Sequence, residues 1–330
     1  MQLSFDLIKT ATNGVIGTFV KDNRLNFRRF TDKQIEYFKA TLNDMNKPNK
    51  AIATSGVVID FYTDATELKG SFYCSRATTR SQCFIDVYVD GQMVTHVGEK
   101  VPEEKFDYPI DFTTALGCGE KRVTIFLPNL FKAELQSLSI IGGQKFIPVK
   151  KDKNVMFFGD SITQGYISDF ASYTYVNRLS YYKNWNAINF GMGSTIFDAN
   201  DLDEDIPFTP DEIFIAYGTN DWTKSPDLEG MMRAYLTKLQ ATYKGVRLTV
   251  ITPVWRGEQE EYMIKKGITQ TFSELQTQIK DIANEFENVR IIDGLKLIPH
   301  YPDYFVEDIL HPNDLGFIAY ADGLIRELNK

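Results

Sequence analysis

Four short motifs carry side chains that could together break an ester bond. The first, Gly159-Asp160-Ser161-Ile162, follows an apolar run, and its glycine permits a tight turn that would leave Ser161 at the start of a helix. A serine at such a junction is either a nucleophile whose own N–H faces a developing oxyanion, or a helix cap. The motif alone does not decide between these two roles.

Only three histidines are available as a general base. His96 belongs to a strand-rich part of the chain, and His300 lies in a loop between two prolines. His311 has Asp308 three residues before it, close enough in a turning loop to orient the imidazole and to stabilise its cation. The alternative is a surface histidine next to a helix cap formed by Asp308 or Asn313.

Two further motifs could donate hydrogen bonds to an oxyanion. The glycine-bearing segment 189–195 could present the backbone N–H of Gly193 or Ser194, and Gly218-Thr219-Asn220-Asp221 could present the neutral side-chain amide of Asn220. Each also has a simpler interpretation, as a β–α turn or an Asx turn. Because all four motifs occur in one chain, a shared site is favoured over four coincidences.

Other kinds of site do not fit the spacing. Gly191-Met192-Gly193 lacks the third glycine of a dinucleotide-binding loop, and Tyr166 stands where a Walker A motif has lysine. The chain has neither an HExxH motif nor a Cys/His cluster, so we expect no metal and no cofactor.

The second half of the chain alternates between apolar strands and stretches long enough for helices. Strands are expected at 155–158, 187–190, 213–217, 248–251 and 289–292. This alternation predicts a parallel sheet between two layers of helices. A final helix is indicated by apolar residues at helical spacing: Leu315, Ile318, Ala321, Ile325 and Leu328. In such sheets ligands bind beyond the carboxyl ends of the strands, and the motifs at 159–162, 189–195 and 218–221 lie there.

The first half consists mainly of strands, expected at 56–62, 84–89, 121–127 and 135–141. Asp90-Gly91 predicts a hairpin after the second of these, and the pair Thr31 and Gln34 predicts a capped helix. Several short strands without helices between them are typical of a β-sandwich. We therefore predict a β-sandwich domain at 1–147 and an α/β domain at 148–330.

Composition excludes several classes of function. The chain has 330 residues and a net charge of −8, from 36 Lys and Arg against 44 Asp and Glu, which opposes binding to nucleic acid. No apolar run approaches the roughly 20 residues that a membrane-spanning helix needs, and the N-terminus does not resemble a signal peptide. We therefore expect a cytoplasmic protein with neither nucleic-acid nor membrane partners, and leave open whether it forms a homo-oligomer.

Taken together, the four motifs resemble the four blocks of the SGNH (GDSL-type) hydrolases, over roughly residues 150–330. The resemblance implies a flavodoxin-like three-layer α/β/α domain that performs ester hydrolysis or acyl transfer. It implies that Ser161 is the nucleophile, His311 the base and Asp308 its orienter. The oxyanion donors would be Asn220, the N–H of Ser161, and the N–H of Gly193 or Ser194.

One position departs from the family pattern. The glycine of the family's second block usually aligns with Ser194, so either Gly193 or Ser194 could be the backbone donor. The β-rich first half also resembles, more loosely, the N-terminal jelly roll of two-domain carbohydrate esterases.

The substrate is less well defined by the sequence. Trp222 and Trp255-Arg256 follow predicted strands and could line a pocket for a sugar, and Asp160 adjoins the nucleophile, so these are our predicted substrate-binding residues. Core packing of either tryptophan, and a solvated Arg256, are the alternatives. The leading hypothesis is removal of a small acyl group, with acetyl as the first candidate, from a small-molecule or oligosaccharide ester. A transferase or thioesterase with the same triad, and a non-catalytic glycan-binding protein, are the other hypotheses.

Overall fold

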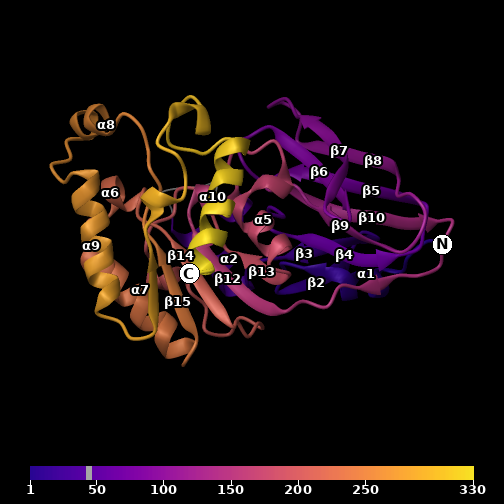
Figure 1. The fold of residues 1–330 in the computed structure, drawn as a ribbon, viewed down its shortest axis with the longest axis horizontal. Coiled ribbons are helices and arrows are strands. Elements are labelled where there is room, and N and C mark those ends of the chain that lie inside the picture. The colour runs from indigo at the N-terminus through magenta and orange to yellow at the C-terminus, as the bar shows by residue number, and fades with distance from the viewer. Residues whose placement is uncertain (42–46) are drawn as a thin grey trace.

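The computed structural model describes residues 1–41 and 47–330, and its first half contains two antiparallel sheets (Figure 1). One sheet has the order β1 (Thr12–Asn13), β4 (Val58–Thr63), β9 (Lys121–Phe126), β6 (Gln82–Val89) and β7 (Gln92–Lys100), with β11 (Ile147–Pro148) paired to β4. The other has the order β2 (Gly17–Lys21), β3 (Arg24–Arg28), β10 (Phe131–Ile141), β5 (Glu67–Arg76) and β8 (Asp107–Ala115).

The two sheets enclose an apolar core, which confirms the predicted β-sandwich. Ile59 of β4 and Leu135 of β10 are fully buried in that core, together with other aliphatic and aromatic residues of both sheets. Asp90 and Gly91 join β6 to β7 with positive φ angles of 46° and 86°, as the predicted hairpin requires. The capping box of Thr31 and Gln34 is present and starts helix α2 (Asp32–Ala40).

The second half forms a five-stranded parallel sheet. Its strands are β12 (Lys153–Gly159), β13 (Trp185–Asn189), β14 (Glu212–Ala216), β15 (Arg247–Ile251) and β16 (Val289–Ile292), in the order β13-β12-β14-β15-β16. Numbered along the second half, this is the order 2-1-3-4-5 of the flavodoxin-like fold. The predicted fold class is confirmed, and the expected strands agree with the observed ones to within two residues at each end.

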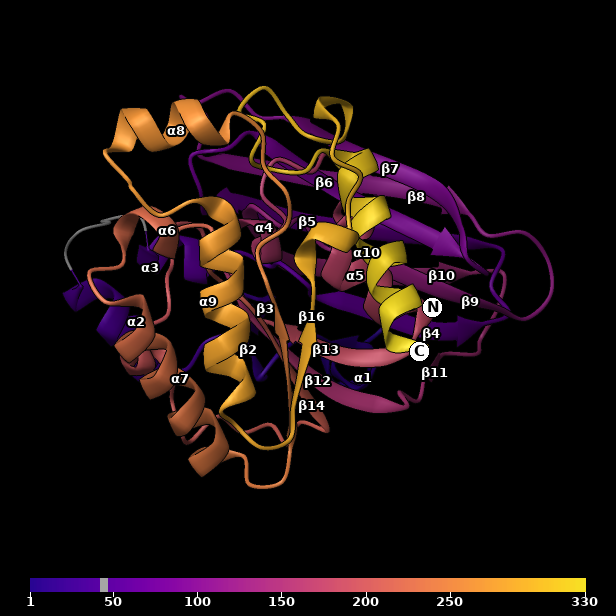
Figure 2. The ribbon, with the colours of Figure 1, turned by 60° about the vertical axis from the view of Figure 1, so that its left-hand side comes forward.

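Alternate residues of each strand face opposite layers of helices. Met156 and Phe158 of β12 pack toward α7 (Leu228–Thr242) and α9 (Phe272–Asn284). Val155 and Phe157 pack toward α5 (Tyr175–Tyr182) and α10 (Asp314–Leu328) on the other face. The two views of the ribbon show these helices on either side of the sheet (Figures 1 and 2).

The remaining helices are short or peripheral. They are α1 (Phe5–Ala11), α3 (Lys47–Ala51), α4 (Ser161–Gln164), α6 (Asp221–Lys224), α8 (Gln259–Lys266) and the 3-10 turns at Ala171–Tyr173, Ala199–Asp201, Gly294–Lys296 and Pro302–Tyr304. Within the described ranges, none of the helices is both long enough and apolar enough to cross a bilayer.

One part of the final helix differs from its prediction. Leu315 is 51% exposed, although the spacing places it on the apolar face. The buried face of α10 is centred instead on Phe317, Tyr320 and Leu324. Leu315 lies in the first turn of the helix, directly after the Asn313 cap, and is not among its buried residues.

The two halves of the chain are joined by packing as well as by the linker. Phe30 lies just before α2 and Phe38 lies within it. Both pack in the same core as Phe158 and Phe190 of the α/β half. The segment that joins the two halves is also fixed, because Lys151 forms an ion pair with the buried Asp60 of β4. Part of the first half therefore completes the helical layer on one face of the parallel sheet.

Candidate active site

Ser161 lies where strand β12 turns into helix α4. A side chain at Gly159 would come within 2.0 Å of Thr163 Oγ1 and 2.9 Å of the Ala216 carbonyl oxygen, so only glycine fits there. Asp160 then caps α4 by accepting a hydrogen bond from the N–H of Ile162 at 2.9 Å. The turn leaves Ser161 at the first helical position, with its side chain close to the protein surface.

Ser161, His311 and Asp308 form a hydrogen-bonded chain. The Ser161 hydroxyl oxygen lies 2.8 Å from His311 Nε2, and His311 Nδ1 lies 2.6 Å from Asp308 Oδ2. These distances allow Ser161 to donate its proton to the imidazole while Asp308 accepts from the other ring nitrogen. The structure thus brings together the three residues that the sequence predicted as a triad, although 150 positions separate the serine from the histidine.

The carboxylate of Asp308 is held in its ionised form. Its Oδ1 accepts backbone hydrogen bonds from Leu310 and His311, both at 2.9 Å, while Oδ2 is bonded to the imidazole. Burial would raise the pKa of Asp308, but these bonds and the charge of His311 outweigh it and lower the pKa to about 2. Asp308 is therefore an acceptor for the imidazole throughout the neutral range.

The loop that carries the histidine is fixed on both sides. The carbonyl oxygen of Ile309, which has a positive φ of 46°, accepts from Gly257 N–H at 2.9 Å. The ring of Tyr166 lies against that of His311 with 4.9 Å between ring centres. Helix α10 starts just beyond the loop and is capped by Asn313, not by Asp308, whose oxygens are used within its own loop.

The turn at 189–195, hereafter the oxyanion turn, follows β13 beside Ser161. The N–H of Gly193 donates to Gln164 Oε1 at 2.9 Å, so it is already engaged. Ser194 has a φ of 72°, in the left-handed region where glycine is usually found. Of the two residues that the sequence left open, Ser194 is favoured by this geometry as the backbone donor, and its positive φ accounts for the family's usual glycine.

Asn220 lies at the end of the neighbouring strand β14 and starts helix α6. Its Nδ2 donates to the Thr195 carbonyl oxygen at 3.1 Å, and its Oδ1 accepts from Lys224 Nζ at 3.3 Å. A primary amide has two N–H groups, so one orients Asn220 on the oxyanion turn and the second can donate to a ligand.

We expect replacement of Asn220 by alanine to lower kcat for ester hydrolysis by roughly 10²–10³-fold, the usual effect of losing one oxyanion donor. The substitution also removes the hydrogen bond to the Thr195 carbonyl oxygen. Asn220→Ser, which keeps a side-chain donor, is therefore a useful companion variant. Steady-state kinetics on a p-nitrophenyl ester would measure the effect. Unchanged kcat in Asn220→Ala would show that the amide does not face the reacting carbonyl.

Two buried carboxyl groups support the strand ends around Ser161. Asp221 is 3% exposed and accepts from the N–H groups of Phe197 and Gly218, both at 3.0 Å, so it ties the segment after β13 to the end of β14. Burial raises the pKa of Asp221 to about 7 and that of Asp160 to about 6. Asp221 had no role in the sequence prediction, although it stands next to Asn220 in the same motif.

Asp160 makes the stability of the fold depend on pH. Its pKa is raised from 3.8 to about 6, so between about pH 4 and 6 the unfolded chain loses this proton first and folding becomes less favourable as pH rises. We expect Asp160→Asn, which can still cap α4, to remove this loss, worth up to about 3 kcal/mol. Urea unfolding at several pH values would measure it. A constant difference between variant and wild type across this range would contradict the expectation.

The predicted substrate-binding residues beyond Asp160 have distinct surroundings. Trp222 is 5% exposed, and its indole N–H donates to the Gln270 carbonyl oxygen at 2.9 Å, so it is a core residue and not a rim residue. Trp255 is half-buried and stacks on His300 with 5.5 Å between ring centres. Both tryptophans therefore have partners within the fold, and the core-packing alternative fits Trp222.

Arg256 is 4% exposed, which contradicts the alternative of a solvated side chain. Its guanidinium lies 3.7 Å from the centre of the Tyr262 ring, and burial lowers its pKa. Its Nε and Nη1 are buried and have no hydrogen-bond partner among the described residues. Such unpaired N–H groups are costly in a folded protein, so they mark this side chain as a candidate for contact with a ligand.

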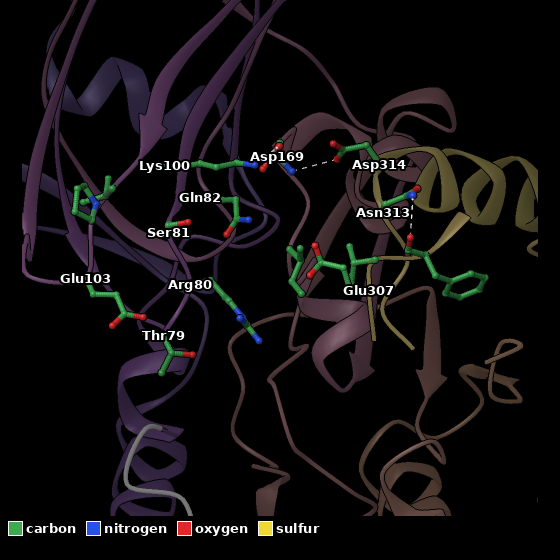
Figure 3. Close-up of a pocket in the computed structure, with 15 residues that line it drawn as sticks. Thr79, Arg80, Ser81, Gln82, Lys100, Glu103, Asp169, Glu307, Asn313 and Asp314 are labelled. Atoms are coloured by element: carbon green, nitrogen blue, oxygen red, sulfur yellow. Dashed lines mark hydrogen bonds and ion pairs between the residues drawn. The ribbon is translucent and has the colours of Figure 1, made fainter. Parts of the chain in front are cut away.

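A cleft of about 770 Å³ opens between the two halves of the molecule (Figure 3). Arg80 extends into it from the sandwich, and Glu307 extends into it from the α/β half. An ion pair between Lys100 and Asp169, at 2.8 Å, bridges the two sides. Polar side chains that can exchange hydrogen bonds with hydroxyl groups line the wall formed by the sandwich: Thr79, Ser81 and Gln82.

No member of the triad lines this cleft, but two of its lining residues are neighbours of the triad loop or of a residue that contacts it. Glu307 directly precedes Asp308, and the Arg80 guanidinium lies 4.7 Å from the centre of the Tyr166 ring, which in turn contacts His311. Arg80 and Tyr166 were not predicted as site residues. No local motif links either of them to the loop that carries His311. Among the described residues, no group of three or more His, Cys, Asp or Glu side chains could hold a metal ion.

Comparison with known proteins identifies a family match and similar folds. Residues 157–317 match the GDSL-like Lipase/Acylhydrolase family, whereas no curated protein sequence matches the chain. Among solved structures, the salicylyl-acyltransferase SsfX3 from a tetracycline biosynthetic pathway is 18% identical, with a TM-score of 0.77, and the match covers 96% of this chain and 93% of that one.

Two family two carbohydrate esterases are also similar in structure. The one from Cellvibrio japonicus is 16% identical with a TM-score of 0.63, covering 100% of this chain and 97% of that one. The one from Clostridium thermocellum, in complex with cellohexaose, is 14% identical with a TM-score of 0.61, covering 84% and 93%. At these identities the likeness shows a shared two-domain fold.

Proposed function

We propose that the protein, whose residues 157–317 match the GDSL-like lipase/acylhydrolase family, is a serine esterase that removes small acyl groups, acetyl first among them, from a carbohydrate. The observation that carries this proposal is the hydrogen-bonded chain from Ser161 through His311 to Asp308. A decayed, purely glycan-binding protein would have no reason to keep all three groups in bonding geometry.

In the proposed reaction, Ser161 attacks the ester carbonyl carbon as its proton passes to His311 Nε2. The negative charge on the carbonyl oxygen is stabilised by the N–H groups of Ser161 and Ser194 and by the amide of Asn220. His311 then gives the proton to the leaving alcohol, and an acyl-enzyme remains. Water, deprotonated by His311, attacks the acyl-enzyme and releases the carboxylic acid and free Ser161.

The cleft supports a saccharide as the alcohol part of the ester. Its volume of about 770 Å³ lies within the usual range for small-ligand sites, and it lies at a domain boundary, as such sites often do. Hydroxyl and amide side chains on its walls can both donate to and accept from sugar hydroxyls. The structural similarity to esterases that act on carbohydrates supports the same choice.

Arg256 is our proposed contact for a further polar group of the substrate. Its two unpaired nitrogens, Nε and Nη1, belong to the segment that holds the His311 loop through the Gly257–Ile309 hydrogen bond. A substrate oxygen that reached them would satisfy groups that are otherwise buried without partners.

Acyl transfer is the second candidate, favoured by the similarity over 96% of the chain to an acyltransferase. Both reactions share the acyl-enzyme. They differ only in whether water or an acceptor alcohol takes the acyl group from it. A cleft open to solvent could hold either acceptor.

The test is to follow both products from acetylated xylo- and cello-oligosaccharides, with and without an added acceptor alcohol. We expect free acetate as the main product, and kcat/KM for p-nitrophenyl esters that decreases from acetyl to butyryl to octanoyl. A new ester formed in place of acetate would favour transfer. Absence of acyl release from all of these esters would refute the proposal.

A further inference from the structure

Two cations from the first half of the chain bind carbonyl groups of the oxyanion turn. Arg29, which follows β3, is 2% exposed, and its Nη1 donates to the carbonyl oxygens of Asn189 and, at 3.5 Å, of Gly191. Lys50 of α3 is 8% exposed, and its Nζ donates to the Gly193 carbonyl oxygen at 3.2 Å. The carbonyl groups of Asn189, Gly191 and Gly193 are thus all bound by cationic side chains from the first half of the chain.

The two cations also hold each other in place. Arg29 Nη2 donates to the backbone carbonyl oxygen of Lys50 at 3.2 Å, and Nε donates to that of Ala53 at 2.7 Å. Burial lowers the pKa of Arg29 to about 9, so it remains a cation at neutral pH. Because long charged side chains are rarely buried, a pair that binds backbone carbonyl groups so close to a nucleophile needs a reason.

The peptide unit between Gly193 and Ser194 transmits the position of Lys50 to the active site. This unit is planar and trans, like every peptide bond in the described ranges, so its C=O and N–H point in opposite directions. When Lys50 holds the Gly193 carbonyl oxygen, the Ser194 N–H must point away from Lys50. Gln164 Oε1, which accepts from the N–H of Gly193, fixes the preceding peptide unit as well.

A cation on the carbonyl oxygen also strengthens the N–H of the same peptide unit. Hydrogen bonds to charged donors are stronger than neutral ones, and bonds in series polarise one another in a low-dielectric interior. The Ser194 N–H would therefore be both better aimed and more acidic than in a turn backed by solvent. Such preorganised donors act on the charge that develops in the transition state.

We propose that Lys50 is a positioning residue for the oxyanion hole, aiming and polarising the Ser194 N–H, with Arg29 fixing Lys50 and the earlier part of the turn. This inference rests on the proposed esterase function. It implies that the first half of the chain completes the catalytic site from behind, in addition to forming one wall of the cleft.

The test compares Lys50→Met, which keeps the length of the side chain but removes the charge, with Lys50→Arg, which restores it. The matched control is Lys33→Met, because Lys33 also belongs to this part of the chain but pairs with Asp203. Hydrolysis of p-nitrophenyl acetate gives kcat and KM, with kcat referred to active sites counted from the burst. Hydrogen exchange of the segment 189–195 and the melting temperature are measured on the same variants.

For Lys50→Met we expect kcat to decrease by roughly 10–100-fold, less than for removal of a donor, with KM unchanged. Amide exchange in the oxyanion turn should become faster, and Lys50→Arg should recover most of both properties. A purely structural role would lower the melting temperature and the number of active sites but leave kcat per site unchanged, which would overturn the proposal.

The two proposals can fail separately. If the wild-type protein shows no esterase activity, the proposed function is wrong, and the exchange measurement still decides whether Lys50 fixes the turn. If the wild type is active but Lys50→Met matches Lys33→Met in both kcat and exchange, the positioning role is wrong while the esterase function stands.

Discussion

Replacement of Ser161 by alanine is expected to lower kcat for ester hydrolysis by roughly 10⁴–10⁶-fold, as loss of the nucleophile does in other serine hydrolases. The hydroxyl lies 2.8 Å from His311 Nε2 and is the atom that would form the acyl-enzyme, so no nearby group can replace it. Residual rate would come from water bound beside an intact oxyanion hole. Stopped-flow kinetics with p-nitrophenyl acetate would also show that the burst of p-nitrophenol is lost.

The alanine variant should fold normally, since it removes one oxygen atom from a side chain at the first position of helix α4. Ser273→Ala, on the exposed face of α9, is the matched control for a serine substitution far from the site. Substantial activity in purified Ser161→Ala, with the control unchanged, would mean that another group is the nucleophile. The hydrogen-bonded chain would then have a structural purpose only.

The nucleophile and the general fold could be predicted from the sequence because their signals are local. Gly159 and Ser161 lie two positions apart at the end of an apolar strand, and Asp308 lies three positions before His311. Since the strands of a parallel sheet end at one edge, motifs that follow different strands must meet there. His311 precedes the last helix instead of following a strand, so its pairing with Ser161 was predicted from the four motifs together and from the family resemblance.

The supporting residues could not be predicted, because their contacts join distant parts of the chain. Arg29 and Asn189 are 160 positions apart, and neither lies in a pattern that points to the other. The choice between Gly193 and Ser194 depended on a φ angle and on the bond to Gln164, which is a feature of packing. A solvated Arg256 was one alternative, because its neighbours Trp255 and Gly257 give no sign that the ring of Tyr262 will cover the guanidinium.

Asparagine in place of Asp308 should separate the orienting role of this residue from its place in the loop. The side chain keeps its size, and its oxygen can still accept from the N–H groups of Leu310 and His311. Its NH₂ group, however, would face His311 Nδ1 and favour the tautomer that carries the proton on Nε2. That nitrogen could then no longer accept the proton of Ser161.

We therefore expect Asp308→Asn to lower kcat by roughly 10³–10⁴-fold, with KM little changed. The loss should be smaller than for Ser161→Ala, because the Asp308 side chain is 42% exposed and solvent can reorient the imidazole in part of the molecules. Asp303→Asn, which changes an exposed carboxylate of the same loop region, is the matched control in kinetic assays.

The pH at which stability is lost provides a second readout. The pKa of Asp308 is about 2, below its ordinary 3.8. The stabilising effect of this carboxylate is therefore complete above about pH 4 and disappears as pH falls toward 2. The variant should lack this acid-dependent part of the stability, and a variant with wild-type kcat would show that His311 is oriented by other contacts.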